Sequence, residues 1–117
     1  MANAASFTEA LKPKTQIHTG RVRLTAFNAS HIDAVDTFIQ LFDAASTGDV
    51  TLGTTTPNAV LSLPAGNGTL RSHVYEPLGG QDGMGVAFTL GMVAAVTTTV
   101  SGNTAVTTAI PITFYLS

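Results

Sequence analysis

The chain has 117 residues, a length that suits a single domain with one buried core. It contains no cysteine, which excludes a disulfide framework, a thiolate metal site and a cysteine nucleophile. Only 10% of the residues are charged and the net charge is −2 without a basic stripe, so the usual electrostatic footprint of a nucleic-acid-binding protein is missing. A surface this poor in charge predicts that other protein covers much of it.

The first 19 residues do not show the pattern of a core element. "SFTEAL" predicts one helical turn with Ser6 as its cap and Glu9 three residues later, and Pro13 ends it. "KPKTQIHTG" then predicts extended chain. We expect an N-terminal arm over residues 1–19, followed by one β domain over residues 20–117; a disordered terminus is the alternative. Candidate contacts of the arm with a neighbouring protein are Lys12, Lys14 and Ile17.

From Gly20 onward, apolar residues recur with a period of two, which is typical of β-strands. "RVRLTAFN" (21–28) places Val22, Leu24 and Ala26 on one face of a strand. After a short loop, "VDTFIQLFDAA" (35–45) predicts a strand of roughly seven residues.

This second strand is apolar on both faces. Phe38, Gln40 and Phe42 share one face, and Ile39 and Leu41 share the other. Such a strand belongs in the interior of a sheet whose two faces are both covered. The core of the domain would cover one face, and a loop, the arm or a neighbouring subunit would cover the other.

Further strands are predicted over 59–66, 70–78, 86–100 and 104–117, separated by turn signals. The run 86–100 is too short and too rich in threonine for a membrane helix, and Gly91 predicts a bend in it. In the last strand Pro111 cannot donate to a ladder, which predicts an edge strand or an irregular start. The sequence therefore predicts an all-β fold, an antiparallel β-sandwich of roughly seven strands with an extended N-terminal arm.

Motifs for chemistry are weak throughout. The glycine-rich stretch 79–85 lacks the lysine of a phosphate loop, and a strand follows it instead of a helix. His31, Asp33 and Asp36 lack the register of a metal site, and no G-x-S-x-G elbow is present. We expect no enzyme, no catalytic, cofactor-binding or metal-binding residues, no cofactor, and neither nucleic acid nor membrane as a partner.

Two blocks, "LTAFNASHIDAVDTFIQLFDAA" and "FTLGMVAAVTTTVSGNTAVTT", resemble small virion structural proteins of tailed bacteriophages. The residues that carry the resemblance are Asn28, Phe38, Ile39, Gln40, Leu41, Asp43, Ala44, Gly91, Met92, Val93, Ala95, Val96, Thr97 and Thr98. The resemblance implies a β-sandwich on the virion exterior, such as a capsid decoration (cement) protein. It transfers no active site, and it does not extend to the first 19 residues or to the region 51–66.

The resemblance implies that the major capsid protein is the partner and that the protein is a homo-oligomer, with a trimer on local three-fold axes of the head shell. Ile39, Leu41, Ala94 and Val96 are candidate interface residues, with Pro111 and Tyr115 at an edge. The alternative is a module of a tail fibre or spike that binds a host receptor or a glycan through the loops 79–85 and 54–57. A small hydrolase would need a convergent polar cleft, for which the sequence gives no sign.

Overall fold

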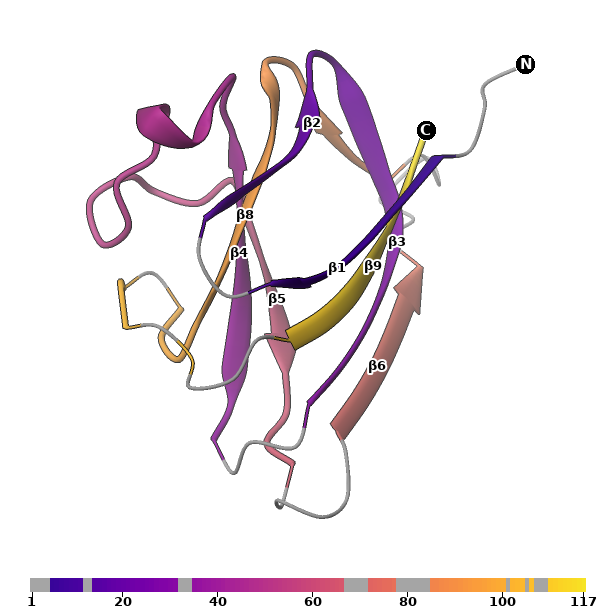
Figure 1. The fold of residues 1–117 in the computed structure, drawn as a ribbon, viewed down its shortest axis with the longest axis vertical. Helices are drawn as coiled ribbons and strands as arrows, with labels where there is room; N and C mark the ends of the chain where they lie inside the picture. The colour runs from indigo at the N-terminus through magenta and orange to yellow at the C-terminus, as the bar shows by residue number, and fades with distance from the viewer. Residues whose placement is uncertain are drawn as a thin grey trace.

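The computed structural model of the chain describes residues 5–11, 14–31, 35–66, 72–77, 85–100, 102–104, 106 and 110–117. Within these ranges the chain forms nine β-strands and one 3₁₀ turn, η1 (Thr47–Asp49). All strand pairs are antiparallel, and the strands build two facing sheets (Figure 1). The predicted all-β sandwich is confirmed, with more strands than the roughly seven expected.

The five-stranded sheet contains β1 (Ala5–Leu11), β9 (Ile110–Leu116), β3 (Val22–His31) and β6 (Ser72–Pro77) in that spatial order, with β7 (Val86–Phe88) pairing the first residues of β3. The four-stranded sheet has the order β2 (Thr15–Thr19), β8 (Gly91–Thr97), β4 (Thr37–Asp43) and β5 (Ala59–Leu63). The chain passes from one sheet to the other between β7 and β8, so the expected bend in 86–100 lies at Thr89 and Leu90, directly before Gly91.

The N-terminal segment is extended, as expected, but it does not leave the body of the domain. β1 pairs with β9 and β2 pairs with β8, so the first strands form one edge of each sheet. The helical turn expected over "SFTEAL" is absent because these residues lie in β1, where backbone pairing over seven residues outweighs a single capped turn. Ile17 in β2 is buried in the core. Residues 5–11 and 14–19 therefore belong to the sandwich, and the expected division into an arm and a separate domain needs this correction.

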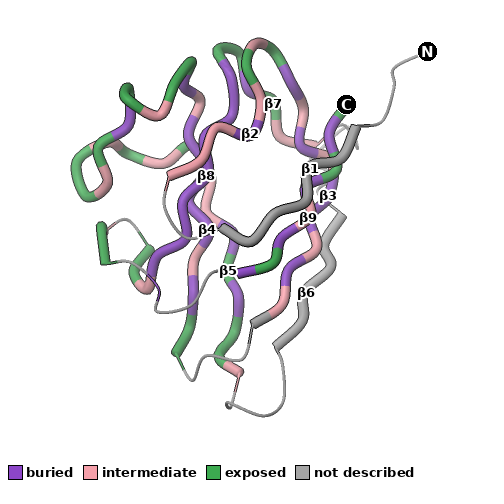
Figure 2. The backbone as a smooth tube through the Cα atoms, in the orientation of Figure 1, coloured by how far each residue is buried: buried purple, intermediate pink, exposed green. Residues whose placement is uncertain are grey.

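Between the sheets lies one hydrophobic core. Figure 2 colours its buried residues purple, together with the other buried residues of the chain. Strand β9 alternates as predicted: its even-numbered residues are buried and Pro111 and Tyr115 are exposed. β9 is nevertheless an interior strand, between β1 and β3. The described partner of Pro111 is on β1 alone, near the start of the strand, so its missing N–H costs little.

A β-bulge in β3 changes which residues face the core. The pairing of β3 with β9 shifts between Leu24 and Ala26. Val22 and Leu24 face the core before the bulge, whereas Phe27 and Ala29 face it afterwards. The expected single face of Val22, Leu24 and Ala26 is therefore wrong at Ala26, since the inserted residue reverses the alternation.

Strand β4 lies between β8 and β5, in the interior of its sheet as predicted. Ile39 and Leu41 belong to the core between the sheets, and Phe42 belongs to a second apolar cluster on the opposite face. That second cluster includes Ala44, Val50, Val93 and Ala95, with Leu52 packed against it. The chain's own loop after β4, which carries η1, therefore covers this outer face.

A second loop covers the same outer face beside Gln40, which is fully buried. The Gln40 Nε2 donates to the Thr97 Oγ1 at 2.7 Å and to the Gly102 carbonyl at 3.0 Å. Around Gln40 and Phe42, segments of the chain itself thus cover the outer face of the four-stranded sheet, whereas Phe38 stays half-buried. Of the three covers considered for this strand, the structure shows a loop.

Candidate docking face and basic groove

The outer face of the five-stranded sheet follows from its register. Residues that pair directly across neighbouring strands share a face of the sheet. One row runs from Ser6 through Tyr115 and Ala26 to Pro77. The next row runs from Thr8 through Thr113 and Asn28 to Tyr75, and Ala10 pairs Pro111 while Ser30 pairs His73. We call the described side chains of these rows the neutral face: Ala26, Asn28, Ser30, Pro111, Thr113 and Tyr115.

The neutral face contains no aspartate, glutamate, lysine or arginine. Of its described side chains, Pro111 and Tyr115 are exposed, and Asn28, Ser30 and Thr113 are half-buried. Protein interfaces are depleted of charge in their centre and enriched in tyrosine. The composition of this face is therefore that of a surface suited to contact with another protein.

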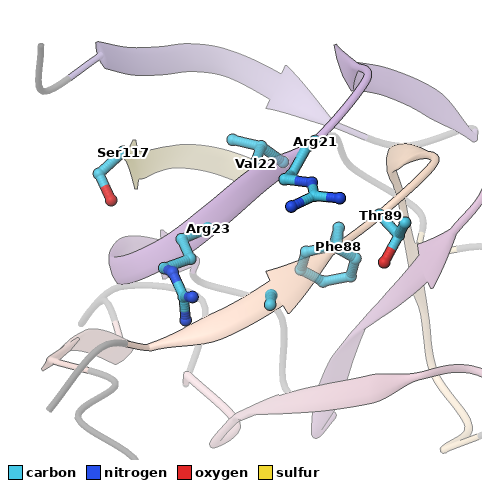
Figure 3. Close-up of a pocket in the computed structure, with 7 residues that line it drawn as sticks. Arg21, Val22, Arg23, Phe88, Thr89 and Ser117 are labelled. Atoms are coloured by element: carbon cyan, nitrogen blue, oxygen red, sulfur yellow. The ribbon is translucent and has the colours of Figure 1, made fainter. Parts of the chain in front are cut away.

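One end of the neutral face is basic. Beyond the β3 bulge, Arg23 pairs Ala87 on the outer side of the sheet, and Arg21 lies two residues earlier. A groove of about 400 Å³ opens there (Figure 3). In Figure 3, Arg21 lies toward Phe88 and Thr89, and Arg23 lies on the side nearer Ser117. We call this the basic groove, lined by Arg21, Val22, Arg23, Ala87, Phe88, Thr89 and Ser117.

The basic groove combines carbon surface, from Ala87 and the arginine stems, with two cations. Val22 and Phe88 are buried residues of the core, whereas Arg21 is exposed and Arg23 is half-buried. Across the part of the chain that the structure describes, neither guanidinium group has an ion-pair or hydrogen-bond partner. The groove thus presents unpaired N–H donors beside carbon surface.

The wall at Thr89 is held by Asp43 at the end of β4. The Asp43 carboxylate accepts hydrogen bonds from the Thr89 N–H at 3.0 Å and from the Leu90 N–H at 2.7 Å. Partial burial raises the pKa of the Asp43 carboxyl, but the backbone N–H groups of Thr89, Leu90 and Gly91 outweigh this effect and hold the pKa below its ordinary value of 3.8. Asp43 therefore fixes the crossover between the sheets.

Several interface candidates from the sequence lie elsewhere than expected. Ile39, Leu41, Ala94 and Val96 are at most 1% exposed and face the core between the sheets, so a neighbouring subunit cannot reach them in the folded chain. Ile17 is likewise buried in this core. Ile39 and Leu41 were expected on the outer face of β4, but the outer face is the one that carries Phe42.

The remaining candidates divide into three kinds. Lys12 lies outside the described residues. The Lys14 Nζ donates to the Thr47 carbonyl at 3.0 Å and to the Val50 carbonyl, so it ties the start of β2 to the loop that covers the second cluster. Pro111 and Tyr115 are exposed on the neutral face and stay candidates for an interface. The loop 54–57 is described near η1, whereas 79–84 lies outside the described residues.

Sequence reasoning missed the neutral face because its rows join strands far apart in the chain. The alternation of Pro111, Thr113 and Tyr115 was the available signal, but the bulge in β3 concealed the matching residues. The two arginines were noted only as members of an N-terminal group of basic residues. Their position beside Ala87 depends on the pairing of β7 with β3.

No family model, curated protein or solved structure matches the chain. Among the described residues, no three histidine, aspartate or glutamate side chains gather closely enough to hold a metal ion. A search of the same residues finds no helix with the length and apolar character needed to cross a membrane.

Proposed function

We propose that this protein is a non-enzymatic virion structural protein that decorates the head shell of a tailed bacteriophage and binds the major capsid protein from outside. The observation that carries the proposal is the contrast between the two outer faces of the sandwich. The chain's own loops cover one face, around Phe42 and Gln40, while the neutral face has no charged residue. The resemblance of the two sequence blocks to phage virion proteins supplies the identity of the partner.

The neutral face suits a permanent contact more than solvent. An uncharged face that binds another protein avoids the cost of removing charges from water. The exposed Tyr115 and Pro111 are rigid side chains that lose little conformational entropy when they are buried. A cement protein needs such a contact, because it adds stability to a preformed shell by binding neighbouring capsid subunits at once.

The expected trimer is part of the same proposal. Because Ile39, Leu41, Ala94 and Val96 are enclosed within one chain, contacts between copies must use other surfaces. Light scattering on the purified protein, alone and with capsids, measures the oligomeric state. A monomer under both conditions would exclude the trimer. It would not decide whether the neutral face is the docking face, which has a separate test.

The test of the docking face places a charge on it. Asn28→Glu and Tyr115→Glu introduce a carboxylate into the neutral face, and Thr56→Glu introduces one at an exposed position of the loop that covers the other sheet. We expect co-sedimentation with heads of the source phage to fall at least about tenfold for the first two variants and to stay unchanged for the control, because a buried unpaired charge costs several kcal/mol. Equal binding by all three variants would exclude the neutral face.

A cryo-electron-microscopy map of the source particle separates the proposal from its alternative. Density repeated on every capsomer supports decoration. A few copies at the tail would instead support the fibre or spike module. A particle without this protein would overturn both functions.

A further inference from the structure

We propose that the basic groove binds one carboxylate of the partner protein, an aspartate or glutamate side chain that reaches the groove when the neutral face docks. The groove is defined by this chain's own geometry; only the identity of the partner rests on the proposed function. The inference assigns charge recognition to the guanidinium groups of Arg21 and Arg23, which have no partner among the described residues.

The first argument is charge complementarity. Arg21 directly precedes β3 and Arg23 lies within it; both line one groove, and no aspartate or glutamate among the described residues lines it with them. A guanidinium group presents paired N–H donors that match the two oxygens of a carboxylate. Arginines without partners beside an uncharged face therefore favour an acidic group supplied from outside.

The second argument is the carbon surface of the groove. Val22 and Phe88 are buried, so the carbon surface that a partner can reach comes from the exposed Ala87 and from the stems of the two arginines. A volume of about 400 Å³ is large enough for a whole acidic side chain. The methylene groups of a glutamate can pack on this carbon surface while its carboxylate reaches the arginines. An inorganic phosphate has no carbon atoms with which to make that contact.

The third argument is position. Arg23 and Ala87 continue the outer face of the sheet past the bulge, so the groove adjoins the neutral face. A charged contact at one end of an uncharged interface fixes the orientation of the partner and contributes more to specificity than to affinity. The wall at Thr89 is already held by Asp43, so the groove is formed before the partner arrives.

The groove can be tested without any partner. The full chain is titrated with N-acetyl-glutamate amide, which carries one side-chain carboxylate, while NMR follows the Nε–Hε resonances of Arg21 and Arg23. We expect saturable shifts of both resonances with the glutamate derivative and no shift with the matched glutamine derivative. In the double variant Arg21→Gln/Arg23→Gln, the amide resonances of the other groove residues should no longer shift. No shift in the wild-type protein would overturn the inference. Tighter binding of inorganic phosphate than of the glutamate derivative would overturn the carboxylate assignment.

The second arm measures attachment to heads of the source phage. Arg21→Gln/Arg23→Gln should bind about tenfold more weakly than the wild type. Arg21→Lys/Arg23→Lys should recover part of the loss, since lysine keeps the positive charge but lacks the paired N–H donors of a guanidinium group. Melting temperatures equal to wild type show that both variants are folded. If the wild type binds heads and the glutamine variant binds them equally well, the inference fails and the proposed function stands. If the wild type does not bind heads, the proposed function fails, and the titration alone decides the groove.

Discussion

The carboxylate of Asp43 accepts a 2.7 Å hydrogen bond from the backbone N–H of Leu90, which lies 47 residues further along the chain. Asp43 ends β4, and Leu90 belongs to the turn that carries the chain from the five-stranded to the four-stranded sheet. This contact joins the end of one central strand to the crossover that begins the other.

The first prediction concerns acid stability. The pKa of Asp43 is lowered in the folded chain, so the folded state binds this proton less readily than the unfolded state. The stabilisation is therefore fully present above the unfolded pKa of about 3.9 and is lost as the pH falls through the lower folded pKa. Denaturant titrations from pH 6 to pH 2 should show a steeper loss below pH 4 for the wild type than for Asp43→Asn. Parallel pH profiles would contradict this role of Asp43.

The second prediction compares two neighbours on β4. Leu41 is fully buried between the sheets, whereas Phe38 is half-buried on the opposite face. Leu41→Ala should lower the free energy of unfolding by about 2–5 kcal/mol, as other large-to-small core changes do. Phe38→Ala should cost clearly less, although it removes more atoms. Urea denaturation of both variants measures the difference, and an equal or reversed order would exclude this assignment of the two faces.

The third prediction concerns Gly91, the first residue of β8, which has a φ of +152°. A Cβ there would lie 2.7 Å from the Ala44 carbonyl oxygen and 2.8 Å from that of His18. Gly91→Ala should therefore destabilise the fold by more than about 1 kcal/mol, because both oxygens are backbone atoms that cannot move alone.

The control for Gly91 is Gly48, in η1. A Cβ at Gly48 would meet only the Ser46 Oγ at 3.7 Å, an ordinary contact. Gly48→Ala should leave the thermal midpoint nearly unchanged. If both alanine variants melt together, the close approach at Gly91 is not a constraint on the fold.

The fourth prediction concerns the first 19 residues. Their removal takes β1 and β2 from the two sheets, together with the buried Ile17 and the Lys14 contacts to the loop after β4. We expect the truncated chain to lose its cooperative thermal transition, because β8 and β9 would each become an unpaired edge. Circular dichroism and an NMR amide spectrum report the outcome. A sharp transition within a few degrees of wild type would show that these strands contribute little.

The sequence was sufficient for the class of fold and for the interior position of β4. Strong alternation and a strand that is apolar on both faces are local patterns, and the folded chain buries the residues that form them, such as Ile39, Leu41 and Phe42. The assignment of the two faces could not be made in this way. Both faces of β4 are apolar, and only the loop after it, through Val50 and Leu52, shows which one is outside.

The N-terminal strands were unpredictable for a different reason. Whether residues 5–19 form strands depends on pairing with β8 and β9, whose sequences are remote, and not on their own propensity. The same dependence hid the neutral face and the basic groove, which exist only once β3 is in register with β9, β6 and β7.

The pairing of Ala5 with Leu116 has a consequence for biosynthesis. β1 precedes the other described strands in the chain and pairs with β9, so this edge of the five-stranded sheet cannot form until β9 has been synthesised. Long-range pairing of this kind slows folding, and until it is complete the nascent chain exposes apolar strands such as β8. The yield of folded protein therefore depends on how long these apolar strands stay exposed before β1 pairs with β9.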